Sequence, residues 1–397
     1  MDEHLETPVR ASFGPALAVI VAVSVFTVTL GIVYPYLTIL LSARGFPSSI
    51  IGINAAMIPV GLIIGSIVTP KFAMRHGPYA VALLSIFASA VLLTSMYLWL
   101  DFANNENLFY LLMPLCVCLG IFINGLFVIG EAWINKLAPP DLRGRLLGVY
   151  TTALIAGYGV GPILLSISAG SDLMIQSASL LFLLAAAGPL FYYFTTIRAL
   201  EFTTGTNRAG SGQGMIGFAL RAPYLVLCFA SIALLDNASM ALMPLYGEAQ
   251  GIGVEKIGLV LGSIIIGGAV FQPMIGVLAD KSSNDRVICL ASVATIALAF
   301  VFYLTSDFFL LTIIAFFWGG AAFGTYTMSL KKLGDEHTGA DLLTGSGLLA
   351  LTWGLTTVVG LPAVGSLIGA TDEVYLPLFL VALYVPLVVL SLRNFQD

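Results

Sequence analysis

Twelve long apolar runs, separated by short polar turns, constrain the fold of this chain more than any other feature. A helix needs about 20 apolar residues to span the hydrocarbon core of a bilayer. Only 9% of the 397 residues are charged, whereas soluble domains carry about 25%. The sequence therefore predicts an all-α membrane protein with twelve transmembrane helices, at about residues 13–42, 48–70, 78–100, 108–134, 142–169, 174–196, 222–248, 254–280, 286–305, 308–330, 341–369 and 374–392.

The distribution of basic residues predicts how these helices are oriented. With the N-terminus inside, all but two of the 16 Lys and Arg residues fall on the inner side, and the exceptions are Arg44 and Lys256. Cytoplasmic loops carry such an excess of basic residues, so we expect both termini to be cytoplasmic. Residues 1–10 lack the basic segment and cleavage site of a signal peptide, so we expect the first helix to be retained.

A polar stretch and an internal repeat divide the chain into two halves. Residues 45–52 parallel residues 251–258, and the segment from Asp141 to Pro162 parallels the segment from Asp341 to Pro362 at the same spacing. Between the halves lies a Gly- and Ser-rich stretch that is typical of a flexible linker. Repeated six-helix halves predict two pseudo-symmetric bundles around a site near the bilayer midplane. The expected parts are an N-terminal bundle at 1–197, a cytoplasmic linker at 198–220 and a C-terminal bundle at 221–397.

A charged turn between the eighth and ninth predicted helices carries a family motif. It reads Gly276-Val277-Leu278-Ala279-Asp280-Lys281, and Arg286 follows six residues after the acid. This pattern resembles the loop motif of the major facilitator superfamily of secondary transporters. The resemblance extends over essentially the whole chain, and it implies the twelve-helix fold of that family and transport by alternating access. The corresponding turn of the first half, residues 69–77, has no acid at the matching position.

A second, more local resemblance lies around the end of the fourth predicted helix. The sequence Gly130-Glu131-Ala132-Trp133 is followed by Arg143-Gly144-Arg145 at the start of the next helix. This arrangement looks like the bacterial YcaD-type branch of the superfamily. The resemblance implies a multi-pass protein of the bacterial inner membrane.

The sequence shows no machinery for catalysis. All three His residues lie in polar ends, and the four Cys residues lie inside apolar runs without the spacing of metal ligands. No Gly-Lys dipeptide exists, so the chain cannot build a phosphate-binding P-loop. We therefore expect no enzyme activity, no metal site and no cofactor. Topology explains the basic loops without a nucleic-acid partner, and we expect a monomer in the lipid bilayer.

Asp236 is the residue that most strongly indicates a functional site. It is the only Asp, Glu, Lys, Arg or His near the centre of a predicted helix. A charge at that depth costs at least a few kcal/mol, so such a residue faces a cavity or a partner. No intramembrane base is present to pair with it, and burial favours a protonated carboxyl. We interpret Asp236 as a site for proton coupling or for a polar or cationic substrate group. The alternative is a neutral acid bonded to Asn237 or a neighbouring helix.

Other polar residues are candidates for the lining of a transport cavity. By analogy with the family, the first, fourth, seventh and tenth helices line this cavity, and Gln272 on the eighth helix has a similar character. Packing is the alternative explanation for each candidate. The candidates on the four helices are Tyr34, Tyr36, Asn124, Asn237 and Tyr326.

Charged residues near the cytoplasmic ends of helices are candidates for gate contacts. Glu131 lies in the last turn of the fourth helix, where an acid opposes the helix dipole and needs a nearby base. We therefore expect it to pair with Arg143 or Arg145, either as a gate or as a static contact. The same reasoning applies to the charged turn that contains Asp280, Lys281 and Arg286.

Together, these features predict a secondary active transporter for a small organic solute, with protons as candidate coupling ions. The absence of intramembrane Lys and Arg argues against a strongly anionic substrate, so neutral, zwitterionic and cationic solutes remain. Two alternatives stay open. One is an efflux antiporter for drugs or other amphipathic compounds, and the other is a membrane assembly factor or sensor that kept the fold without transport.

Overall fold

The computed structural model describes residues 13–102, 105–137, 143–168, 171–195, 215–336 and 339–393, and these residues form helices and turns without any strand. The first half of the chain forms five long helices and a pair of shorter ones. Their bounds are α1 (Phe13–Ala43), α2 (Ser48–His76), α3 (Pro78–Phe102), α4 (Asn105–Leu137), α5 (Arg143–Ile167), α6 (Asp172–Ala185) and α7 (Ala187–Tyr192).

The second half repeats this arrangement after a short helix, α9 (Met215–Arg221), which lies mostly in the segment predicted to be a linker. Within the described residues, eleven helical segments are long and apolar enough to cross a membrane, and a shorter apolar segment covers Thr152–Ile167. The prediction of an all-helical membrane protein is therefore confirmed. The remaining bounds are α10 (Pro223–Ala249), α11 (Val254–Lys281), α12 (Asn284–Tyr303), α13 (Phe308–Glu336), α14 (Gly339–Ala370), η1 (Glu373–Tyr375), α15 (Leu376–Leu380) and α16 (Tyr384–Arg393).

Two of the predicted continuous helices are interrupted by proline. The sixth span divides into α6 and α7 next to Ala186, and the twelfth divides between α15 and α16 at residues 381–383. A proline cannot donate a hydrogen bond to the carbonyl four residues earlier, and its ring clashes with that carbonyl. Pro189 thus accounts for the end of α6 at Ala185, and Pro386 accounts for the second break.

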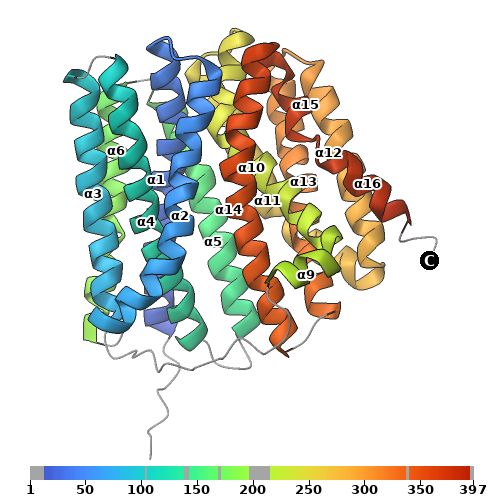
Figure 1. Cartoon of the computed structure of the whole chain (residues 1–397), viewed down its shortest axis with the longest axis horizontal. Helices are drawn as coiled ribbons and strands as arrows, with labels where there is room; N and C mark the ends of the chain where they lie inside the picture. The colour runs from blue at the N-terminus through green and yellow to red at the C-terminus, as the bar shows by residue number, and fades with distance from the viewer. Residues whose placement is uncertain are drawn as a thin grey trace, which may run out of the picture.

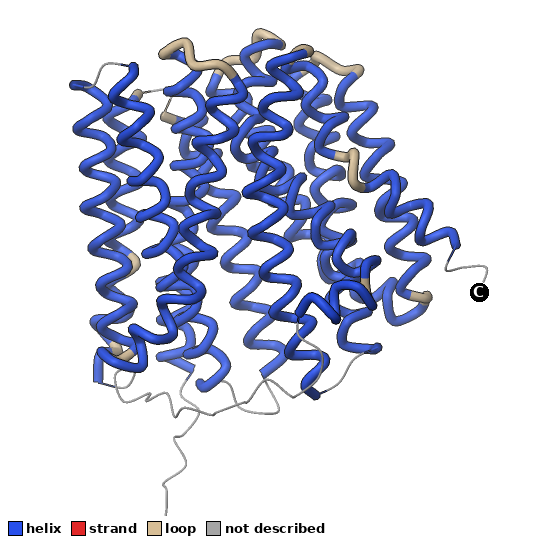
Figure 2. The backbone as a smooth tube through the Cα atoms, viewed as in Figure 1, coloured by secondary structure: helices blue, strands red, loops and turns tan. Residues whose placement is uncertain are grey.

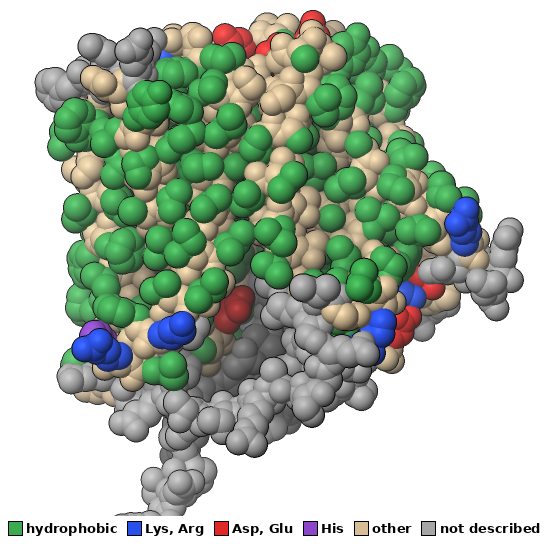
Figure 3. All heavy atoms as spheres, in the orientation of Figure 1, with side chains coloured by type: hydrophobic (Ala, Val, Ile, Leu, Met, Phe, Trp, Pro, Cys, Tyr) green, Lys and Arg blue, Asp and Glu red, His purple; other side chains and the backbone are tan. Residues whose placement is uncertain are grey.

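The helices assemble into two bundles that stand side by side (Figure 1). In the first bundle, α1 packs against α5 and α6, and α2 packs against α4. In the second, α13 packs against α11 and α12. Contacts between the bundles run mainly through the pairs α2–α14, α5–α11 and α1–α10. Loops lie mainly at the two ends of the molecule (Figure 2), and hydrophobic side chains cover the flank between those ends (Figure 3), as expected for a protein surrounded by lipid.

The bundles are joined at one end of the molecule, which we call the closed end. It holds the α1–α2 turn and the α10–α11 turn, where the equivalent residues Gly45 and Gly251 both have positive φ, 78° and 67°. Glycine adopts this conformation without steric cost, so the repeat in the sequence corresponds to a repeated turn. Near this end Gly52 of α2 packs on the backbone of Leu361 in α14, and Gly258 of α11 packs on the backbone of Pro162 in α5.

Side chains also connect the bundles at the closed end. Ser42 Oγ donates a hydrogen bond to Glu248 Oε2 at 2.5 Å, and Ser48 Oγ donates to Glu373 Oε1 at 2.7 Å. Each serine belongs to the first bundle and each glutamate to the second. At the opposite end, which we call the open end, the space-filling view shows a hollow between the bundles with an acidic side chain on its wall (Figure 3).

Candidate functional site

Asp236 lies near the middle of α10 and is buried, with 8% of its surface exposed. Its side-chain Oδ1 atom is buried and has no hydrogen-bond partner, while its backbone carbonyl accepts a bond from Ser239 Oγ at 3.0 Å. Buried polar atoms almost always have a partner, and the exceptions require an explanation. A carboxyl left open in this way is suited to receive a proton or a ligand.

Two tyrosines of the other bundle lie within electrostatic range of this carboxyl. Tyr34 of α1 and Tyr158 of α5 both lie close enough to Asp236, and to each other, for electrostatic interaction. Within the described part of the chain, neither phenol hydroxyl makes a hydrogen bond. Tyr384 of α16 approaches Asp236 from within its own bundle. The carboxyl therefore lies at the interface between the bundles, together with two hydroxyls that are free to bind.

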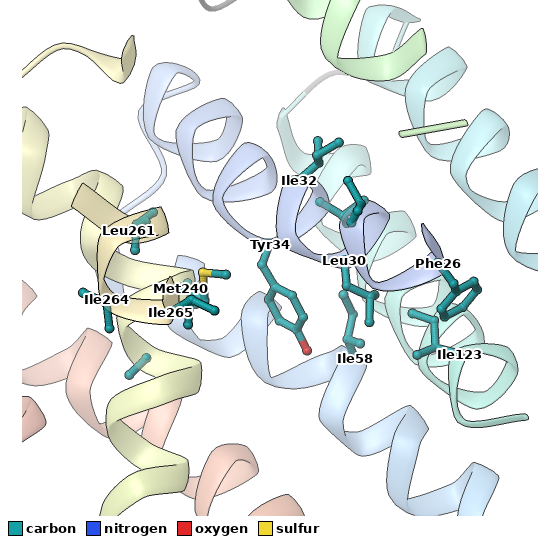
Figure 4. Packing of buried hydrophobic residues seen from close by; sticks show 14 of the residues in the cluster. Phe26, Leu30, Ile32, Tyr34, Ile58, Ile123, Met240, Leu261, Ile264 and Ile265 are labelled. Atoms are coloured by element: carbon teal, nitrogen blue, oxygen red, sulfur yellow. The ribbon is translucent and has the colours of Figure 1, made fainter. Parts of the chain in front are cut away.

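Figure 4 shows how Tyr34 reaches this interface. Its ring lies between Met240 and Ile265 of the second bundle on one side and Ile58 of α2 on the other, with the hydroxyl at the far tip. Tyr36, two residues later, points elsewhere: its hydroxyl accepts a bond from Gln176 Nε2 at 3.2 Å inside the first bundle. Of the two tyrosines predicted on the first helix, the structure brings only Tyr34 to Asp236.

The predicted amides are placed differently from one another. Asn237 Nδ2 donates to the carbonyl of Ala233 on its own helix at 3.0 Å, and Gln272 Oε1 accepts a bond from the Thr327 hydroxyl of α13. Asn124 of α4 is half-buried against Gly65 of α2, and its Oδ1 atom has no hydrogen-bond partner. Two of the three amides thus use their polar atoms within one bundle.

An aromatic group lies on the open-end side of Asp236. Phe229 is seven residues earlier on α10, so it lies about two turns away on the same face. The Tyr326 ring of α13 packs edge-on against Phe229 and against Trp353 of α14, with centroid distances of 5.5 and 5.8 Å. Tyr326 and Trp353 are both half-buried. The arrangement forms an aromatic wall between the open end and the carboxyl.

Glu131 occupies the open end of the first bundle. Its side chain is exposed and lies within electrostatic range of Tyr150 in α5 and Tyr326 in α13. It therefore lies near the second bundle at the open end. The side chains of its predicted partners, Arg143 and Arg145, lie outside the part of the chain that the structure describes.

The second charged turn is only partly described. The side chains of Asp280 and Lys281 lie outside the described residues, and Arg286 is exposed at the start of α12. Nearby, Asn284 Nδ2 donates to Asp335 Oδ2 at 2.8 Å. This amide, with the Lys331 ammonium, holds the pKa of the Asp335 carboxyl below its usual value.

An ionic network that the sequence analysis missed connects the helix ends of the second bundle. Lys332 of α13 pairs with Asp285 of α12 at 3.1 Å and with Glu336 at 2.6 Å. The Tyr224 ring of α10 lies 5.5 Å from the Lys332 ammonium, and its hydroxyl shares a hydrogen bond of 2.8 Å with Ser391 of α16. Paired bases at the end of an apolar run were a visible signal for such a network, but the sequence does not identify the partner.

Comparisons with known proteins agree with this architecture. The family model described as Major Facilitator Superfamily matches residues 17–360. The chain is 23% identical over 362 residues to the uncharacterized MFS-type transporter YfkF of Bacillus subtilis (strain 168), and the match covers 87% of this chain and 85% of that protein. The crystal structure of a mutant of the nucleoside transporter NupG has a TM-score of 0.75 at 13% identity, covering 96% of this chain and 100% of that one.

Proposed function

This chain belongs to the major facilitator superfamily, and from that premise we propose that it moves a small neutral, zwitterionic or cationic organic solute by alternating access. Asp236 is the proposed site of proton coupling or of substrate binding. The supporting observation is its unpartnered carboxyl at the interface between the bundles, beside Tyr34 and Tyr158.

The position of this carboxyl favours a role in coupling. When the bundles rock against each other, residues at their interface change surroundings, whereas residues inside one bundle do not. An isolated charge at membrane depth is costly and must be neutralised. No described base interacts with the Asp236 carboxyl. A proton or a bound cation can neutralise it, and either one links the charge of the site to the movement of the bundles.

The proposed gate contacts lie at the open end. With both termini in the cytoplasm of a bacterium, the open end faces the cytoplasm and the closed end faces outward. Glu131 with Arg143 or Arg145 is the proposed cytoplasmic gate contact at this end. The turn that holds Asp280, Lys281 and Arg286 is proposed to act in the same way. Exposed ion pairs contribute only about 0–1 kcal/mol, so they can form and break in each cycle.

Solute-driven proton movement tests this proposal. The protein is reconstituted in liposomes that contain a pH-sensitive dye, and uridine, glycine betaine and phenyltrimethylammonium are added as neutral, zwitterionic and cationic probes. At least one probe should change the internal pH in wild-type liposomes. The change should be absent with Asp236→Asn, which keeps the size of the side chain. Solute flux with the same pH dependence in both proteins would remove Asp236 from the coupling mechanism.

A cross-link distinguishes a transporter from an assembly factor or sensor with the same fold. The side chains of Ser42 and Glu248 touch across the closed end, so Ser42→Cys with Glu248→Cys, in a background without the four native cysteines, can tie the bundles together. We expect oxidation to abolish flux and reduction to restore it. Flux that survives complete cross-linking would contradict alternating access.

A further inference from the structure

The charges around Asp236 restrict the charge that the solute can carry. No described Lys, Arg or His interacts with the Asp236 carboxyl, so no described base neutralises it. Its Oδ1 atom is buried and unpartnered, in a residue that is only 8% exposed. A negatively charged solute would be repelled here. A solute with one positive charge would replace the missing counter-ion.

The small number of free hydrogen-bonding groups near Asp236 limits how many polar groups the solute can carry. Among the described residues placed near this carboxyl, the unpartnered groups are the carboxyl itself and the hydroxyls of Tyr34, Tyr158 and Tyr384. The Asn237 amide donates one hydrogen bond within α10, and the Gln272 amide accepts one from Thr327 of α13. A solute with many hydroxyls would leave several of them without partners, which costs about 1–3 kcal/mol for each buried group. The site therefore disfavours sugars and nucleosides.

The remaining surface is suited to an apolar body. The wall of Phe229, Tyr326 and Trp353 lies on the open-end side of the carboxyl, with edge-to-face ring contacts at 5.5 and 5.8 Å. Aromatic faces bind both apolar groups and cations. A solute that enters from the open end meets this wall before it reaches Asp236.

On these grounds we infer that the solute is an amphipathic organic amine, and this rests on the proposed transport function. The ammonium group binds the Asp236 carboxyl, with the oxygens of Tyr34 and Tyr158 as further acceptors. The aromatic or alkyl body lies against Phe229, Tyr326 and Trp353. One acid in the site corresponds to one positive charge on the solute.

Equilibrium binding to the purified full-length protein tests this substrate class without requiring transport. The probes are 4-phenylbutylamine, 4-phenylbutan-1-ol and 4-phenylbutyrate, which share a body and differ in charge, with uridine as a polyhydroxylated solute. They are titrated calorimetrically in one detergent at neutral pH. The amine should bind wild type about 10- to 100-fold more tightly than the alcohol, because a charge-assisted hydrogen bond replaces a neutral one. The anion and uridine should show no saturable binding.

Matched variants locate the binding. Asp236→Asn should remove the preference for the amine over the alcohol, whereas Glu373→Gln, which removes an acid at the closed end, should keep it. Equal binding of amine and alcohol to wild type, no binding of the amine, or an unchanged preference in Asp236→Asn would each overturn the amine assignment. Amine binding without any flux in liposomes would instead refute the proposed transport. Flux of a neutral solute alone would refute the amine assignment and leave transport standing.

Discussion

Gly258 tests whether the closed end opens during the transport cycle. This glycine of α11 packs directly on the carbonyl oxygen of Pro162 in α5, which belongs to the other bundle. A Cβ atom at this position would lie closer than 3.0 Å to that oxygen and 3.0 Å from Ser166 Cβ. Because a backbone carbonyl cannot rotate away, Gly258→Ala forces α5 and α11 apart at the closed end.

The expected shift between the closed and open states follows from this steric overlap. Excess volume in a well-packed contact costs about 1–3 kcal/mol. The contact joins the two bundles, so it exists when the closed end is closed and is lost when that end opens. The whole cost therefore falls on one of the two states. We expect Gly258→Ala to shift their ratio about 5- to 150-fold toward the state that is open at this end.

A buried reporter at the closed end measures this shift. Ala241 of α10 is fully buried, and its carbonyl accepts a bond from Thr38 of the other bundle. We would introduce Ala241→Cys in a background without the four native cysteines and measure its reaction with a membrane-impermeant maleimide. Gly258→Ala should raise the labelling rate by about the same factor as the population of the open state.

A second glycine of α11 provides the control. Gly267 packs on the carbonyl of Phe316 in α13, inside the same bundle. Gly267→Ala should destabilise the bundle in both states and leave the labelling rate of Ala241→Cys near the parental value. If Gly258→Ala labels no faster than Gly267→Ala, the closed end does not open by separation of α5 from α11, and the reasoning fails.

Two further substitutions test contacts at the opposite ends. Glu248→Gln weakens the hydrogen bond from Ser42 at the closed end. Exposed charged contacts contribute about 0–1 kcal/mol, so we expect the labelling rate of Ala241→Cys to rise by up to about fivefold. An unchanged rate would show that this contact does not hold the closed end together. Lys332→Met leaves the partly buried Asp285 without its base, and we expect a loss of about 1–3 kcal/mol, seen as a lower thermal midpoint. Lys331→Met removes a base that is 34% exposed and should change the midpoint little, so equal effects of the two would contradict a structural role for Lys332.

The helices could be predicted well from the sequence because a segment surrounded by lipid must satisfy its backbone hydrogen bonds internally. Apolar runs of membrane length are expected to form helices, and the predicted spans correspond, with small shifts of their ends, to the described helices other than α9. The breaks at α6–α7 and α15–α16 were missed, although Pro189 and Pro386 were visible. Proline also lies inside several uninterrupted helices, such as α1 at Pro35, so its presence alone does not decide where a helix breaks.

The candidate site was only partly predictable because it depends on how helices face one another. Asp236 is conspicuous in the sequence, since it is a lone acid in an apolar helix. Tyr34 and Tyr36 are equivalent in the sequence, yet residues two positions apart on a helix point about 200° from each other, and only Tyr34 reaches the interface. Tyr158 was missed because composition does not reveal which face of α5 meets the second bundle. The partner of Lys332 was missed for the same reason.

The access of position 236 from the two sides of the membrane tests the central claim most directly. Asp236→Cys, in a background without the native cysteines, is exposed to a membrane-impermeant methanethiosulfonate in right-side-out and in inverted vesicles. We predict faster reaction from the cytoplasmic side in the parent, and a rise in reaction from the outer side when Gly258→Ala is added. If the cysteine at position 236 reacts from neither side, with or without Gly258→Ala, the result would contradict the claim that Asp236 lies at an interface that opens when the bundles move.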